Sequence, residues 1–377
     1  MSDETLFPVA PGGQPAVYVL HENPSWLPPF VEAFAAEGVP LIEWQVTGGV
    51  LDLDQVPPPG VFWSRFSASS HTRGHEISKD LTRSVLSWLE LWGAPTVNGR
   101  SVLELEVSKV AQLVALHRAG IAVPRTVAVF GPDDLWQTAQ GFDAPFILKH
   151  NQGGKGLGVR RFDSHGALRA YLDSPDYDAP VDGIELLQEY VPPSDGFITR
   201  AEFIGGKFLY AVKVDTTRGG FQLCPADACE IDPFLVPGAT SLEFCPADSV
   251  PGPVFAPVPA PLTVPAPVVS APLAPIQVVP ASLEFCPADL APAPSTGASL
   301  FSWREGFDHP IIGAYEAFLA EHHIAIAGIE FIETADGRLV TYDVNTNTNY
   351  NSAVEAVVPL PAARAVARYL GGLLQKA

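Results

Sequence analysis

The sequence predicts an α/β protein, with a small parallel lobe at the start and α+β lobes built on antiparallel hairpins after it. Up to about residue 100, strand-like apolar runs alternate with helix-like amphipathic runs, the order that forms a parallel sheet. After that point, strand-like runs are joined in pairs by glycine-containing turns, as in β-hairpins. We therefore expect an N-terminal domain over 1–100 and a second domain over 101–377, which carries a proline-rich insertion at about 230–300.

The first lobe is predicted from five short segments. Strands are expected at 16–20, 60–63 and 95–97, and helices at 26–38 and 77–92. The turn that leaves the second strand is rich in Ser, Arg and His, and ligands of such sheets bind at the carboxyl ends of strands. Candidate substrate contacts are therefore Arg65, Ser67, His71 and Arg73. His71 and His75 also have the spacing of helical metal ligands, but no third ligand is evident, and a solvated loop is the alternative for both.

Three further helices are expected in the rest of the chain. Segments 102–118 and 310–322 read as helices that pack on the central lobe, and 361–375 reads as a closing helix.

A glycine-rich turn separates two strand-like runs, 144–150 and 158–162. Because the chain returns as a strand and not as a helix, neither the P-loop nor the dinucleotide-binding fingerprint is present. The N–H groups of such a flap can close on phosphates. Its candidate phosphate contacts are Gly153, Gly154, Lys155 and Gly156, with Lys149 at the end of the preceding strand. A purely structural glycine turn is the alternative.

A second hairpin is predicted on either side of Gly205 and Gly206. Pairing directly across these glycines sets Arg200 opposite Ala211, and Lys213 opposite Ile198. One face would then carry Arg200, Glu202 and Lys213, and the other would hold Ala201, Phe203, Phe208, Tyr210 and Val212. Arg200 and Lys213 are candidates for stabilising a phosphoryl group during transfer. An exposed face with an Arg–Glu pair is the alternative.

A third hairpin turns at Asp336 and Gly337, a two-residue turn signal. If Ala335 pairs with Arg338, Glu330 falls opposite Asp343, and Asn345 shares the face of Asp343. The opposite, apolar face would hold Ile329, Phe331, Val340, Tyr342 and Val344. Facing carboxylates repel each other unless a cation or a proton lies between them, and hard oxygen ligands suit Mg²⁺. A polar, solvated sheet face is the alternative.

The insertion has an internal repeat. Residues 241–248 recur identically at 282–289, and 221–227 is a diverged third copy. Between the identical copies, 249–281 contains ten prolines and no charged residue, which excludes a continuous membrane helix and favours a polyproline-II or disordered linker. The insertion is either a dispensable expansion or an arm that docks a partner or substrate.

Composition narrows the partners. With 377 residues and a net charge of −20, the chain is large enough for several packed lobes and too acidic to bind nucleic acid. The first residues lack a secretory signal, so we expect a cytoplasmic protein without a membrane partner; a homo-oligomer is compatible with the sequence. The four cysteines form no disulfide framework, although Cys224 and Cys229 could hold a soft metal.

The order of these motifs resembles the ATP-grasp superfamily, and within it the ribosomal-protein glutamate ligases. The motifs are the glycine hairpin, the segment Gln188-Glu189-Tyr190-Val191, the arginine hairpin and the acidic hairpin ending in Asp343-Val344-Asn345, and the likeness covers roughly residues 100 to 360. The resemblance implies an ATP-grasp fold whose two lobes hold ATP between antiparallel sheets. It implies that Lys109 and Lys149 contact ATP phosphates, that Gln188, Glu189, Tyr190 and Val191 read adenine, and that Glu330, Asp343 and Asn345 hold Mg²⁺, with Mn²⁺ as an alternative.

Two departures from the family pattern concern the substrate side. Ile198 replaces the family's Asp two residues before the clamp arginine, and 346–351 replaces the usual Ser-Pro-Gly after the metal asparagine. That second loop should lie where the acceptor enters, so Asn347 and Asn349 are candidate substrate contacts, and the family's own substrate cannot be carried over.

These features together predict an ATP-dependent carboxylate–amine ligase. A small-molecule or peptide carboxylate would attack the γ-phosphoryl group, and an amine would then displace phosphate from the acyl phosphate. The absence of a Ser/His/Asp or Cys/His set agrees with chemistry that needs no protein nucleophile. The alternatives are a phosphotransferase on the same fold and an ATP-gated binding protein without turnover.

Overall fold

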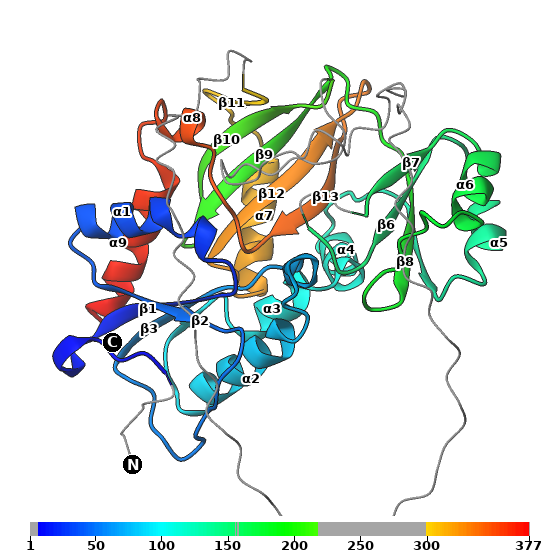
Figure 1. Ribbon diagram of the computed structural model, residues 1–377. Coiled ribbons are helices and arrows are strands. Elements are labelled where there is room, and N and C mark those ends of the chain that lie inside the picture. Colours follow the sequence, from blue (N-terminus) through cyan, green and yellow to red (C-terminus); the bar gives the residue numbers. More distant parts are fainter. Residues whose placement is uncertain (1–6, 155, 157, 218–298, 377) are drawn as a thin grey trace, which may run out of the picture. The chain divides into compact units, whose positions relative to one another are not determined.

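The structure, a computed structural model, describes residues 7–154, 156, 158–217 and 299–376 (Figure 1). These residues belong to one compact unit of the chain, and a second unit, 236–298, lies outside them. The repeated motif, the four cysteines and Lys155 also lie outside the described residues, as does nearly all of the predicted insertion. In the described ranges, no helix is both long and apolar enough to cross a membrane. The cytoplasmic location stays a prediction.

The first lobe is a four-stranded parallel sheet with strand order β2-β1-β3-β4. Its strands are β1 (Ala16–His21), β2 (Leu41–Gln45), β3 (Gly60–Arg65) and β4 (Thr96–Val97). The sequence reading missed β2, an edge strand on which only Trp44 is fully buried, so that its apolar signal is weak.

Helices cover both faces of this sheet (Figure 1). They are α1 (Pro28–Ala36) and α9 (Ala362–Leu374) on one face, and α2 (Ser78–Leu91) and α3 (Arg100–Glu106) on the other. The end of the chain is therefore built into the first lobe, since Val366 and Leu370 of α9 share a cluster with Val17 and Phe30. The domain boundary at residue 100 stays a prediction.

The second sheet is antiparallel, with strand order β5-β8-β6-β7. Its strands are β5 (Thr126–Phe130), β6 (Phe146–His150), β7 (Arg160–Phe162) and β8 (Ile184–Glu189). Helices α5 (Leu135–Ala139) and α6 (His165–Leu172) bury one face around Phe146, Leu148 and Leu187. The predicted glycine hairpin is β6–β7.

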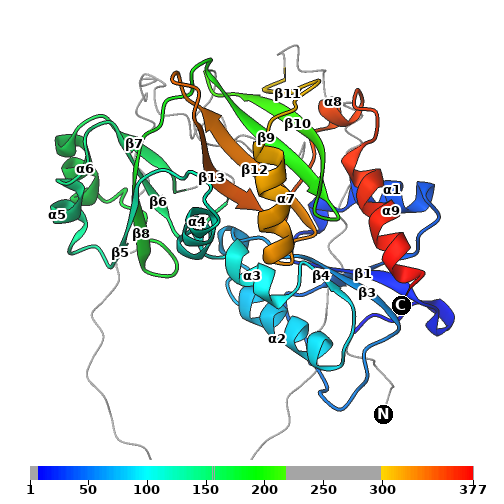
Figure 2. The ribbon, with the colours of Figure 1, turned by 180° about the vertical axis from the view of Figure 1, so that it is seen from behind.

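The third sheet is also antiparallel, with strand order β11-β10-β9-β12-β13. Its strands are β9 (Phe197–Ile204), β10 (Lys207–Asp215), β11 (Phe301–Trp303), β12 (Ile326–Glu333) and β13 (Leu339–Asn345). Helices α4 (Lys109–Arg118) and α7 (Ile311–Glu321) cover its core face, where Leu116 and Tyr315 pack against Phe203 and Phe331 (Figure 2). A short helix, α8 (Ser352–Glu355), follows the sheet. On the opposite face of the sheet, Arg200 and Glu202 lie beside an apolar cluster that includes Ile198, Val212 and Val354 of α8.

Candidate functional site

One cavity of about 410 Å³ brings together residues of the second and third sheets and residues that lie outside the strands of the first lobe. Of the predicted site residues, Ser67, Lys109, Lys149, Gly153, Gly154, Gly156, Gln188, Glu189, Tyr190, Val191, Arg200, Glu330, Asp343, Asn345, Asn347 and Asn349 line it. Four others, Arg65, His71, Arg73 and Lys213, do not line it.

Lys149 is a buried cation that lines the cavity. It lies on β6, its residue is only 6% exposed, and no carboxylate of the described ranges forms an ion pair with it. Burial, assisted by the charge of Lys109, lowers the pKa of Lys149 to about 8. A buried ammonium group that faces a cavity is suited to bind an anion there.

The glycine loop is tied at its base to two other elements. Asn151 accepts hydrogen bonds from the backbone N–H of Val110 (2.9 Å) and the hydroxyl of Ser108 at the start of α4. Gln152 donates to the carbonyl of Ala68 in the first lobe and accepts from Lys79 (2.8 Å). A Cβ added to Gly154 would meet Ser69 at 3.4 Å, so the loop lies directly against the first lobe. The loop's backbone is therefore held over the cavity.

The segment after β8 forms another wall of the cavity. Gln188 pairs with both Thr126 and Ile147, and its side chain donates to the Thr126 hydroxyl (2.8 Å). Glu189 accepts from the backbone N–H of Arg125 (2.8 Å). The Gln188 and Glu189 side chains are thus bonded to Thr126 of β5 and to the residue before it. The adenine-reading role of 188–191 stays a prediction.

The acidic hairpin pairs Glu330 with Asp343, as predicted. Its turn is longer than predicted, because Glu333 pairs with Leu339, and a bulge between Glu330 and Phe331 restores the register. The bulge turns Tyr342 out of the apolar face to which it was assigned. The Tyr342 hydroxyl instead donates to Oε2 of Glu330 (2.8 Å) at the cavity wall. Thr341 takes the core-facing place and bonds Tyr315.

Two cations already balance the two carboxylates. Nη1 of Arg200 donates to Oε1 of Glu330 (2.8 Å), and the Lys109 ammonium group forms an ion pair with Asp343. Burial raises the pKa of Glu330 even though the charge of Arg200 opposes the shift. Burial alone lowers the pKa of Lys109, but Asp343 raises it overall. The repulsion expected from the sequence is therefore relieved by side chains of the protein itself.

The donor set fits a hard divalent cation. Glu330, Asp343 and Asn345 offer carboxylate and amide oxygens, and Asn345 Nδ2 lies 3.3 Å from Glu330 Oε1. In the parts of the chain that the structure describes, no three or more His, Cys, Asp or Glu residues are grouped so that they alone could hold a metal ion. Mg²⁺ is usually held by one or two carboxylates together with substrate phosphates, which agrees with this sparse set.

The arginine hairpin corrects one predicted site residue. Ile204 pairs with Lys207 as predicted, but a bulge between Phe208 and Tyr210 shifts the register by one residue. Arg200 therefore lies opposite Val212, and Lys213 lies opposite Thr199 on the other face. The Lys213 ammonium group lies over the ring of Phe197, 4.5 Å from its centroid, outside the cavity. The prediction that Lys213 shares the face of Arg200 is wrong, and Tyr210 and Val212 are also moved from the predicted core face.

Arg200 is held by three partners. Its guanidinium group donates to Glu202 (2.6 Å), to Glu330 and to the hydroxyl of Thr348. Burial alone lowers the pKa of Arg200, yet the two carboxylates raise it overall, so the group stays charged. The Arg–Glu pair is buried, which excludes the exposed surface pair that was the alternative.

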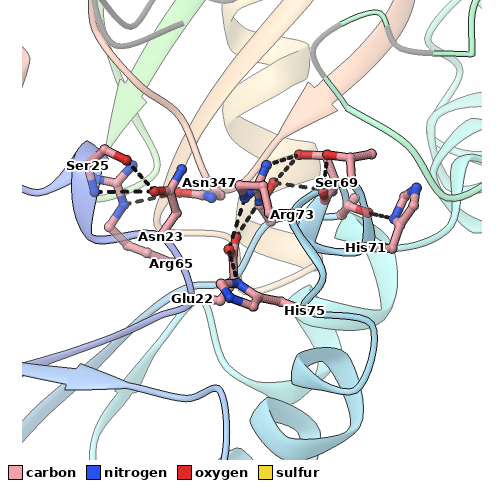
Figure 3. A network of polar contacts seen from close by, with 12 residues as sticks. Glu22, Asn23, Ser25, Arg65, Ser69, His71, Arg73, His75 and Asn347 are labelled. Carbon is pink, nitrogen blue, oxygen red and sulfur yellow. Dashed lines mark hydrogen bonds and ion pairs between the residues drawn. The ribbon is translucent and has the colours of Figure 1, made fainter. Parts of the chain in front are cut away.

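The polar turn of the first lobe divides into two clusters (Figure 3). Arg73 donates to both oxygens of the buried Glu22 (2.7 and 3.2 Å), and His75 lies 3.4 Å from the same carboxylate. His71 contacts the carbonyl of Ala68 (3.2 Å). These three side chains thus have partners within the lobe, and the histidine metal pair stays untested. Arg65 belongs to the other cluster, which joins the loop after β13.

Sequence reasoning missed many residues in and around the cavity, and three of them hold its other side chains or its loop in place. Glu106 accepts from the backbone N–H and the hydroxyl of Thr346 (both 2.8 Å), and burial raises the pKa of Glu106. Tyr342 and Thr348 hold Glu330 and Arg200. No local pattern signals them, because two depend on contacts between distant segments and Tyr342 depends on a bulge.

Solved structures resemble this chain along nearly its whole length. The RimK domain ATP-grasp protein from Sphaerobacter thermophilus aligns with a TM-score of 0.55 and 16% identity, over 94% of this chain and 99% of that chain. D-cycloserine synthetase DcsG aligns with a TM-score of 0.55 and 13% identity, over 95% and 100%. The ATP-grasp ligase PsnB, complexed with minimal precursor, Mg and ADP, aligns with a TM-score of 0.54 and 12% identity, over 95% and 97%. The chain has the ATP-grasp fold, and the predicted fold class is confirmed.

The similarity in sequence covers a shorter part of the chain than the similarity in structure. No family model matches the chain. The probable alpha-L-glutamate ligase of Hydrogenovibrio crunogenus is 28% identical over 145 residues, which cover 37% of this chain and 46% of the relative. That of Methanococcoides burtonii is 28% identical over 140 residues, with the same coverage. The chain thus spans just under half the length of the curated relatives it matches. The predicted resemblance to the glutamate ligase branch of the ATP-grasp superfamily is confirmed.

Proposed function

We propose that this protein is an ATP- and Mg²⁺-dependent ligase that joins a carboxylate to an amine through an acyl phosphate and releases ADP and phosphate. One observation carries the proposal: a single cavity holds the glycine loop, the uncompensated Lys149, the Glu330–Asp343 pair and Arg200. Phosphoryl transfer needs hydrogen-bond donors that bind the phosphates, hard oxygen ligands that bind the metal ion, and a fixed positive charge near the transferred group. The names of the glutamate ligases, and PsnB in complex with Mg and ADP, support the choice of activity and cofactors.

Each residue would have a defined task. Lys149 and the N–H groups of Gly153, Gly154 and Gly156 would bind phosphates, and the backbone of the segment 188–191 would bind adenine. Glu330, Asp343 and Asn345 would hold Mg²⁺, for which Mn²⁺ is an alternative with the same ligand preference. When bound, the ion supplies charge neutralisation at the phosphates.

The bond changes follow from this placement. A carboxylate oxygen of the substrate attacks the γ-phosphorus, the bond to the bridging oxygen breaks, and ADP leaves. The amine nitrogen then attacks the acyl carbon, loses a proton, and phosphate leaves. Arg200 is fixed by Glu202 and Thr348, so its charge can stabilise the transferred group without reorganisation. Lys213 has no part in this scheme, because it lies outside the cavity.

Trapping the intermediate tests the proposal. Carboxylates, amino acids and short peptides are incubated with Mg·ATP and hydroxylamine, which converts an acyl phosphate into a hydroxamate. We expect hydroxamate with the protein as it stands, and about a hundredfold less with Arg200→Ala or Glu330→Gln. Lys213→Ala, on the neighbouring strand but outside the cavity, is the matched control and should retain the yield.

The other outcomes identify the alternatives. A stable phosphoester without hydroxamate would indicate a phosphotransferase. ATP binding without turnover of any acceptor would indicate a binding protein. AMP and pyrophosphate as products would contradict the proposal, because they require attack at the α-phosphate.

A further inference from the structure

Arg65 is a buried guanidinium group that forms no ion pair with any residue the structure describes. The residue is 3% exposed and lies at the end of β3, over the ring of Phe30 (4.1 Å from its centroid). Burial lowers the pKa of Arg65 to about 10. In the described ranges its hydrogen-bond acceptors are uncharged, since no carboxylate pairs with it. A buried charge of this kind is costly unless an anion compensates it.

Its three acceptors all belong to the loop that follows Asn345. Nε donates to Oδ1 of Asn347 (3.0 Å), and Nη2 donates to Oδ1 of Asn349 (2.7 Å) and to the carbonyl of Thr348 (3.1 Å). Both amide oxygens are therefore turned toward Arg65, which fixes the orientation of the two amides. Figure 3 shows Asn347 beside Arg65. The Nδ2 donors of Asn347 and Asn349 are the groups that remain for a ligand in the cavity that these residues line.

The same cluster contains donors without acceptors. Nη1 of Arg65, Nδ2 of Asn347 and the hydroxyl of Tyr350 are buried and have no hydrogen-bond partner among the described residues. Each such group costs free energy when left unpaired. These three donors lie in the cluster of the charged Arg65, and none has an acceptor among the described residues. A bound anion would satisfy both the donors and the charge.

The loop that presents these donors is rigidly anchored. Thr348 bonds Arg200 and Glu202, Thr346 bonds Glu106, and Asn98 donates to the carbonyl of Thr346 (2.8 Å). The loop therefore joins Arg65 of the first lobe to Arg200 of the third sheet, with Asn347 and Asn349 between them. An anchored donor pair loses little conformational entropy when a ligand binds.

We propose that Asn347 and Asn349 form the site that binds a carboxylate group of the substrate beside the metal ligands. Arg65 orients the two amides and supplies the positive charge of this site. The inference rests on the proposed function, since this cavity is where a ligase would receive its carboxylate. It names the chemistry of the substrate group and assigns Arg65 as a positioning residue. The phosphate-binding groups, Lys149 and the glycine loop, belong to other elements, so the site is distinct from that of the nucleotide phosphates.

Acetate, the smallest stable carboxylate with a methyl group, is the probe. The melting temperature of the full chain is measured in about 0.2 M sodium acetate, in sodium chloride, and in acetamide with sodium chloride, all at matched ionic strength. We expect acetate to raise the melting temperature by about 1–3 °C over chloride. Acetamide, which lacks the charge, should not match that shift.

Two variants localise the effect. Asn347→Asp and Asn349→Asp keep the oxygen that Arg65 binds but place a negative charge where the carboxylate would bind. We expect each to keep or raise the melting temperature, because Arg65 gains a counter-ion, and to lose the acetate shift. Gln137→Glu makes the same chemical change on the exposed face of α5 and should keep the shift.

An equal melting temperature in acetate and chloride for the unaltered protein would overturn the inference, and so would retention of the acetate shift in both Asp variants. A parallel titration with Mg·AMPPNP separates this from the proposed function. If the nucleotide stabilises the protein and acetate does not, only the carboxylate site fails; if the nucleotide itself does not bind, the proposed ligase fails.

Discussion

At the scale of single residues, Lys149 should take up a proton when nucleotide binds. Its pKa is lowered from the usual 10.5 to about 8, so near pH 8.5 much of the free protein carries the neutral amine. Bound phosphates restore the charged form, because an opposite charge raises the pKa of an amine. Calorimetric titration with ATP in buffers of different ionisation enthalpy should therefore show proton uptake near pH 8.5. Lys149→Met should abolish the uptake and most of the affinity.

The same lowered pKa affects stability in the absence of nucleotide. Between pH 8 and 10.5 the unfolded chain holds more protons on this lysine than the folded chain does, so the contribution of Lys149 to the free energy of unfolding becomes more favourable as pH rises. Lys149→Met should remove that increment. A protein whose stability has the same pH dependence with and without Lys149 would show that the amine is not perturbed.

The ion pair between Lys109 and Asp343 reverses the effect expected for Asp343→Asn. From the sequence, removing one of two facing carboxylates should relieve repulsion and stabilise the protein without metal. In the structure Asp343 is the partner of Lys109, and Glu330 is neutralised separately by Arg200. We now expect Asp343→Asn to lower the free energy of unfolding by about 1–3 kcal/mol, because a partly buried ammonium group loses its partner.

Chemical denaturation without metal measures this change. Tyr342→Phe is a useful comparison, since it removes a hydrogen bond to Glu330 but no charge. An Asp343→Asn protein as stable as the unaltered one would mean that the ion pair contributes nothing. Added Mg·ATP should stabilise the variant less than the unaltered protein, because one metal ligand is missing.

At the scale of elements, β12 approaches Arg200 so closely that only glycine fits at position 328. A Cβ at Gly328 would lie 2.6–2.8 Å from the guanidinium group of Arg200, which is held on its other side by Glu202 and Thr348. Gly328→Ala should therefore displace the guanidinium group and reduce hydroxamate trapping by about ten- to a hundredfold. Gly313→Ala in α7, where an added Cβ meets nothing within 4 Å, is the control and should leave trapping unchanged. Normal trapping by Gly328→Ala would show that Arg200 can shift without loss.

The two hairpins show how far alternation alone can predict a site. In β9–β10 the turn was predicted correctly, but a bulge near Leu209 places Lys213 on the face opposite the predicted one. In β12–β13 the turn was predicted too short, and a bulge near Tyr342 cancelled that error at Glu330 and Asp343. Bulges insert one residue without a strong sequence signal, and each reverses the facing of the side chains beyond it. Periodicity identified the strands, but it could not decide which side chains face the cavity.

At the scale of the whole molecule, the site depends on contacts between segments that are far apart in the sequence. Lys109 contacts Asp343 across 234 positions, and Arg65 contacts Asn349 across 284. Local patterns carry no information on such contacts, so the sequence could bring Lys109 to the site only through resemblance to a family. The Arg65 cluster departs from that family's loop and became visible only in the structure. The closing helix α9 likewise packs on the first sheet, whose strands lie far from it in the sequence.

The pairing of β10 with β11 predicts that the chain between them can be replaced. Val214 pairs with Phe301, and the N–H of Asp215 donates to the carbonyl of Leu300 (2.9 Å), so the two ends of the intervening segment are hydrogen-bonded neighbours. A short Gly-Ser turn in place of 218–298 could close this hairpin, and shortening a connection changes closure entropy by only about 0.6 kcal/mol per halving. We expect a cooperative unfolding transition within a few degrees of the original, with Mg·AMPPNP still binding. Loss of the transition would show that the replaced segment contributes to the core. Retained nucleotide binding with lost turnover would instead assign the segment to docking of a substrate or partner, the alternative that its composition leaves open.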